Sequence, residues 1–144
     1  ARQLLNSDLM NSIETDDFDR FKHLLEVGAN PNSLHLDHHV GFMTPLMEAS
    51  NNNDPRYVIK LLRYGADPNI VTEGGTALHY ATVNNNSIRI LYLLLKNILN
   101  IQKKVQSKYL GSFRTNLLWV RARHFLFLVC GTSGLCDNSD NSDN

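Results

Sequence analysis

The sequence is poor in cysteine and contains no long apolar run. Its 144 residues include two cysteines, Cys130 and Cys136, both close to the C-terminal end. A disulfide framework therefore does not support the rest of the chain, and we expect a reducing compartment, cytoplasmic or nuclear. No unbroken apolar stretch reaches the roughly 18 residues that a membrane-spanning helix needs, so the sequence gives no sign of such a helix.

Charge is also scarce, and it is unevenly placed. Only 19% of the residues are charged, and the formal net charge is zero. Residues 1–102 hold 8 Lys and Arg against 11 Asp and Glu, residues 103–132 hold 6 against none, and the segment from Ser133 onward has three Asp and no basic residue. With 42% hydrophobic residues, this composition predicts one globular domain followed by a basic extension. Because Ala1 lies inside a plausible helix, we expect the chain to be a fragment of a longer protein.

The most informative stretch runs from Thr44 to Asn69 and predicts two helices. The Thr44 hydroxyl is a good N-cap, and Pro45 suits the first helical position because it lacks the amide hydrogen that would be unpaired there. A polar break of Asn and Asp then precedes Pro55, which can start the second helix, and Gly65 supplies the left-handed residue that ends it. The expected buried positions of the two helices are Leu46, Ala49, Ser50, Tyr57, Val58, Leu61 and Leu62.

This unit resembles an ankyrin repeat. The resemblance is carried by T-P-L at residues 44–46 with Ala49, and by G-A-D-P-N at residues 65–69, close to the T-P-L-H-x-A opening and the G-A-D-x-N exit of that family. A copy of the opening begins at Thr76, 32 residues after Thr44, and a copy of the exit begins at Gly28. Counting back from Gly28 by the 21 residues that separate Thr44 from Gly65 reaches Ser7, which is itself a good N-cap.

The resemblance implies an all-α ankyrin-repeat solenoid of helix-turn-helix units with finger loops. It covers residues 1–102, as units of about 7–32, 44–69 and 76–102. The expected apolar faces of the outer two units are Leu9, Met10, Phe18, Phe21, Leu24 and Leu25 in the first, and Leu78, Ala81, Ile90, Leu91, Leu94 and Leu95 in the third. Such a stack implies a protein-binding function.

The third unit lacks the glycine exit. Residues 97–102 read N-I-L-N-I-Q, so we expect its second helix to run on through Val105. Residues 103–136 do not match a repeat, and residues 103–114 read as a basic loop. Three interpretations stay open: a cap on the open end of the stack, a basic contact for a membrane surface or nucleic acid through residues 103–123, or non-native sequence. The tail, residues 137–144, is low in complexity and is expected to be disordered.

By the resemblance, another protein would bind to the finger loops and to the concave helix face. The first finger, residues 33–43, is five residues longer than the second and carries three His and one Asp within five positions. Tyr64 is added because large amphipathic side chains often anchor interfaces. Imidazoles in such a contact would make binding sensitive to pH between about 5 and 8. The expected partner-binding residues are His35, Asp37, His38, His39, Asn51, Asn52, Tyr64, Glu73, Val83 and Asn84.

We expect no catalytic site, cofactor, metal site or small-molecule substrate. By the family's pattern, His79 would hydrogen-bond to backbone between neighbouring repeats rather than act as a base. A metal site needs ligands fixed on a rigid frame with a supporting shell, and the His-rich finger is a single loop. The predicted function is therefore that of an interaction scaffold or adaptor. The alternative is the recognition domain of a larger enzyme, such as a ubiquitin-ligase adaptor or a kinase.

Overall fold

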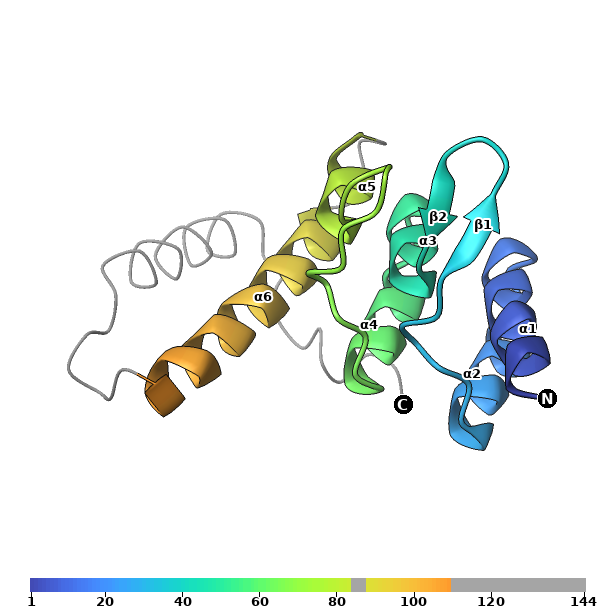
Figure 1. Ribbon diagram of the computed structural model, residues 1–144, viewed down its shortest axis with the longest axis horizontal. Coiled ribbons are helices and arrows are strands. Elements are labelled where there is room, and N and C mark those ends of the chain that lie inside the picture. Colours follow the sequence, from blue (N-terminus) through green and yellow to red (C-terminus); the bar gives the residue numbers. More distant parts are fainter. Residues whose placement is uncertain (84–87, 110–144) are drawn as a thin grey trace.

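The computed structural model describes residues 1–83 and 88–109, which form paired helices and one short β-hairpin (Figure 1). The elements follow one another in this order: α1 (Arg2–Glu14), α2 (Phe18–Val27), β1 (His35–Asp37), β2 (Gly41–Met43), α3 (Pro45–Asn51), α4 (Pro55–Arg63), α5 (Ala77–Val83) and α6 (Ile88–Tyr109). The predicted site residue Asn84, most of the basic extension and the tail at 137–144 lie outside the described residues.

The helix boundaries of the central unit follow from its capping residues. The Thr44 hydroxyl accepts a hydrogen bond from the Met47 amide at 3.2 Å, and Pro45 is the first residue of α3, as predicted. At the start of α4, the Asp54 carboxylate accepts from the Arg56 amide at 3.0 Å. The predicted stop is also confirmed, because Gly65 has a φ of 88°, a conformation that side-chain-bearing residues rarely adopt.

The helices pack in two layers. The first helices of the units, α1, α3 and α5, stand side by side, and each packs against the second helix of its own unit (Figure 1). Most predicted core positions are buried, while Phe18, Leu62, Leu78, Leu91 and Leu95 are only partly covered. The sequence prediction missed Ile13, Ile59 and Leu93, which are also buried. The core is thus a continuous layer shared by neighbouring units, as expected for a repeat stack.

Two details of the sequence prediction are wrong. Ser7 is not an N-cap, because α1 begins at Arg2 and Ser7 lies within the helix. Residues 103–109 are not a loop, because α6 continues to Tyr109. The second correction agrees with the other prediction made there: without a glycine at the exit, the helix runs on past Val105.

Hydrogen bonds made by side chains join the first unit to the second. The side-chain amide nitrogen of Asn32 donates to the Gly65 carbonyl at 3.1 Å, and its side-chain oxygen accepts from the backbone amide of Asp67 at 2.7 Å. The Tyr57 hydroxyl donates to the Asp16 carboxylate at 2.7 Å. These bonds fix how one unit sits on the next.

His79 makes a backbone contact within its own unit, and the bond between neighbouring repeats that the family pattern implies stays a prediction. Its Nδ1 lies 3.1 Å from the Thr76 backbone nitrogen and 2.9 Å from the Thr76 hydroxyl oxygen. Both contacts lie within the same unit, at the start of the third helix pair. His79 therefore supports the local turn into α5 through these contacts.

Candidate binding surface

The long first finger is a two-stranded hairpin. Strands β1 and β2 pair antiparallel, with Leu36 opposite Phe42 and Asp37 opposite Gly41. The Asp37 carboxylate accepts hydrogen bonds from the backbone amides of His39 at 2.7 Å and Val40 at 3.1 Å. These bonds hold the pKa of Asp37 below its usual value. The predicted site residue Asp37 therefore has a structural task, which is to close the turn that presents His38 and His39.

The inner face of the hairpin carries His35 and Asp37. Side chains alternate along a strand, so these two share the face of buried Met43. The His35 ring nitrogen Nε2 lies 2.8 Å from the Ser33 hydroxyl oxygen. Partial burial lowers the pKa of His35, and the carboxylate of Glu14 opposes that shift. At neutral pH the inner face therefore holds a neutral imidazole beside an acidic helix end.

Acidic side chains of α1, α3 and the hairpin interact electrostatically. Burial raises the pKa of Glu48 on α3, and the carboxylates of Glu14 and Asp37 raise it further. Burial also raises the pKa of Tyr80 on α5, with smaller contributions from Asp37 and Glu48. The charge of Asp37 in the first finger therefore affects the pKa of groups on both α3 and α5. Sequence reasoning found Asp37 but missed Glu14, Glu48 and Tyr80.

The second finger is a tight turn beside the first. Thr72 and Gly75 exchange backbone hydrogen bonds, both at 3.0 Å. Glu73, at the tip, lies so close to Gly41 that a Cβ atom on that glycine would collide with its carboxylate. The structure therefore brings the predicted residue Glu73 against the first finger, which places the two fingers next to one another.

The other predicted residues are more dispersed. Asn51 and Val83 lie at the C-terminal ends of α3 and α5, and Val83 is 79% exposed. Asn52 follows α3, and its side-chain amide nitrogen donates to the Ile13 carbonyl at 3.2 Å, so it also joins two units. Tyr64, which is 42% exposed, follows α4, whose C-terminal end lies at the edge opposite the hairpin (Figure 1). The structure does not bring Tyr64 together with the finger residues.

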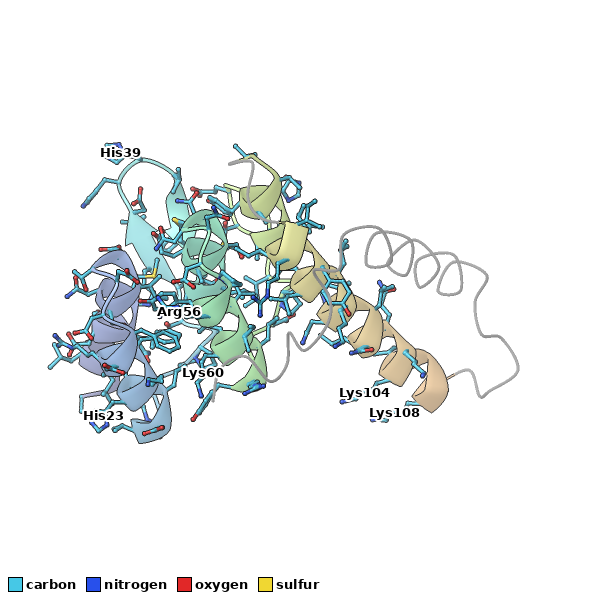
Figure 2. All side chains as sticks on the ribbon, turned by 180° about the vertical axis from the view of Figure 1, so that it is seen from behind. His23, His39, Arg56, Lys60, Lys104 and Lys108 are labelled. Atoms are coloured by element: carbon cyan, nitrogen blue, oxygen red, sulfur yellow. The ribbon has the colours of Figure 1, made fainter. Side chains whose placement is uncertain are left out.

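Basic side chains gather away from the fingers. Figure 2 shows His39 at the tip of the hairpin and His23, Lys60, Lys104 and Lys108 along the opposite edge. The predicted membrane or nucleic-acid contact through residues 103–123 stays a prediction, because most of that segment lies outside the described residues. Among the helices that are described, none is both long and apolar enough to cross a membrane. Within residues 1–83 and 88–109, no three His, Cys, Asp or Glu side chains are grouped as metal ligands.

Comparison with known proteins identifies a repeat family. A family model described as ankyrin repeats in three copies matches residues 9–107. No curated protein matches the chain. The match begins within α1 and ends within α6, and the hairpin lies between the first helix pair and the second.

Proposed function

The chain belongs to the ankyrin-repeat family, and we propose that it binds another protein through its two fingers and the helix face behind them. Ankyrin repeats are generally protein-protein interaction modules. The role proposed for this chain is that of a scaffold or adaptor, and the binding surface is assigned to β1, β2, the turn at residues 70–75 and the facing ends of α1, α3 and α5.

The observation that carries this proposal is the exposure of the first finger. Most of the buried core comes from helices, whereas His38 and His39 in the hairpin turn are exposed. Because the core is already complete without these side chains, they are free to vary in chemistry without unfolding the stack. A five-residue extension that contributes two exposed imidazoles at its tip is therefore better explained by recognition than by stability.

The electrostatics behind the finger support the same assignment. Glu48 is held in a partly buried position near the carboxylates of Glu14 and Asp37, an arrangement that disfavours its ionised form. A partner that brings a donor or a cation into this region would relieve that cost. The proposal that the chain is instead the recognition part of a larger enzyme uses the same surface, and it differs only in what the module is attached to.

Affinity capture tests the proposal. The full chain is immobilised, proteins retained from a lysate are identified, and the capture is repeated with His38→Ala/His39→Ala. We expect the double variant to lose the specific partner while its helical signal and melting curve stay unchanged, because both imidazoles are exposed.

The matched control is His23→Ala. This imidazole is also exposed, but it lies on α2 at the edge opposite the hairpin tip (Figure 2). Retention of the partner by His23→Ala and its loss from the finger variant would support the proposed surface. Equal recovery of the partner by the parent chain and by both variants would show that the finger tip does not contribute to binding.

A further inference from the structure

The hairpin has an outer face that is apolar and exposed. Leu36 and Phe42 are directly opposite in the strand register, and they are 62% and 46% exposed. Because side chains alternate, they lie on the face opposite His35 and Met43, pointing away from the helices. Leu34, two residues before Leu36, is 56% exposed. Cross-strand apolar pairs usually stabilise a sheet by covering each other within a core, but this pair faces solvent.

The second finger adds an exposed apolar residue next to the hairpin. Val71 is 73% exposed, while the next residue, Thr72, turns inward, with its hydroxyl 3.6 Å from the Met47 sulfur. Contact between Glu73 and Gly41 places this finger beside strand β2. We call Leu34, Leu36, Phe42 and Val71 the outer finger face. Isolated exposed apolar residues are ordinary, but a group of this kind on adjacent fingers marks an interaction site.

Apart from their histidines, the two fingers carry charge of one sign. Residues 23–55 contain no Lys or Arg, and neither do residues 64–88. Within these segments the fingers themselves hold two carboxylates, Asp37 and Glu73, whereas Asp54 is paired with Arg56 at 2.7 Å. Glu73 lies at the tip of the second finger, and Asp37 ends β1 with its side chain on the inner face of the hairpin. Fields of one sign steer oppositely charged partners and repel like-charged ones, so this surface favours a cationic partner.

We infer that the outer finger face docks a protein segment that presents apolar side chains flanked by Lys or Arg. The apolar residues would supply most of the buried area, and the negative charge of the fingers, above all that of Glu73, would favour a positively charged segment. This inference rests on the proposed protein-binding function and deepens it, because it names the chemistry of the partner and a face distinct from the concave one.

Selection from a random library of displayed peptides tests the inference. The full chain is the bait, and Leu36→Thr/Phe42→Thr is the counter-bait, since Thr removes the apolar surface yet suits a strand. We expect the enriched peptides to combine Leu, Ile, Val or Phe with a net positive charge. Enrichment of neutral or acidic peptides would overturn the charge argument, and equal enrichment on both baits, or none on either, would overturn the docking face.

Titration of one enriched peptide, measured by fluorescence anisotropy, makes the test quantitative. We expect Leu36→Thr/Phe42→Thr to weaken binding at least about tenfold, and Glu73→Gln to weaken it about threefold and to reduce its salt dependence. The matched control is Leu4→Thr, at an equally exposed apolar position of α1, which is 71% exposed. A Leu4→Thr effect as large as that of the hairpin variant would show non-specific apolar binding and contradict the inference.

The outcome separates this inference from the proposed function. If a captured partner is lost from His38→Ala/His39→Ala but is retained by Leu36→Thr/Phe42→Thr, the fingers bind protein through their tips and inner face, and only the outer face is excluded. If neither variant changes capture, the proposed function fails as well.

Discussion

At the scale of single residues, polar side chains set the boundaries of the helices and the fit between units. Thr44, Asp17 and Asp54 each accept an amide hydrogen bond at a helix start, which satisfies a backbone donor that the helix leaves unpaired. Tyr57 is 1% exposed, and its hydroxyl reaches Asp16 in the preceding unit at 2.7 Å. Burial, followed by this hydrogen bond, raises the pKa of Tyr57 well above its ordinary value.

Removing the Tyr57 hydroxyl tests that bond. We expect Tyr57→Phe to lower the free energy of unfolding by about 1 to 2 kcal/mol, the range for a hydrogen bond to a charged group that is partly exposed to water. Urea unfolding measures the change. Tyr64→Phe, at a position that is 42% exposed, is the matched control and should leave the unfolding midpoint unchanged. Equal effects of the two variants would contradict a specific bond to Asp16.

Glu48 gives a prediction about pH. Burial, and then the carboxylates of Glu14 and Asp37, raise its pKa in the folded protein. Its proton-linked contribution to stability is therefore present below the unfolded-state pKa and is lost as the pH rises through the folded-state pKa. We expect Glu48→Gln to raise the urea midpoint at about pH 7 and to have no effect at about pH 3.5, where Glu is protonated in both states.

The control for this prediction is Glu26→Gln, an exposed position on α2. It should leave the midpoint unchanged at both values of pH. A Glu48→Gln protein that is less stable than the parent at neutral pH would show that the ionised carboxylate makes a favourable contact, and the account of this position would be wrong.

At the scale of elements, the helices were predictable from the sequence, whereas the hairpin was not. Spacings of three and four residues predicted one buried face on each helix of the central unit. Leu46 and Ala49 belong to the first face, Val58 and Leu61 belong to the second, and glycine with proline marked the ends. The first finger has strands of three residues each, too short for alternation to be recognised, so only its extra length was visible. The start of α1 was missed because Ser7 has the side chain of a cap but lies within a continuous helix.

Leu61 tests the assignment of α4. It is fully buried between the two helix layers. We expect Leu61→Ala to cost about 2 to 5 kcal/mol, the range for deleting a large buried aliphatic side chain, which is enough to unfold a short stack. Thermal melting followed by circular dichroism checks this. Leu4→Ala, at an exposed position of α1, should melt like the parent, and an unchanged melt for Leu61→Ala would contradict the packing.

At the scale of the whole molecule, the stacking of the units brings the charged groups of the candidate site into interaction. Glu14, Asp37 and Glu48 come from a helix end, a hairpin and a second helix, and they influence one another only because the units stack. No spacing in the sequence indicates that these three carboxylates interact. The sequence therefore predicted the finger residues but not Glu14 and Glu48. Tyr64 was chosen from its chemistry alone, and the stack places it at the opposite edge.

Asn32 tests the coupling between units. Its side chain joins the two exit loops through the Gly65 carbonyl and the Asp67 amide. We expect Asn32→Ala to lower the free energy of unfolding by about 1 to 3 kcal/mol, since two hydrogen bonds are lost. The urea dependence should also become shallower if the units begin to unfold separately. Asn11→Ala, on the exposed side of α1, is the control and should change neither value.

An amide hydrogen-exchange footprint of the full chain with its captured partner tests directly whether the two fingers form the binding surface. We expect partner binding to slow amide exchange in the two fingers, residues 34–43 and 70–75, and to leave the exchange rates of the α2 and α4 amides unchanged. Protection confined to α2 and α4, with the fingers exchanging as in the free protein, would contradict this expectation.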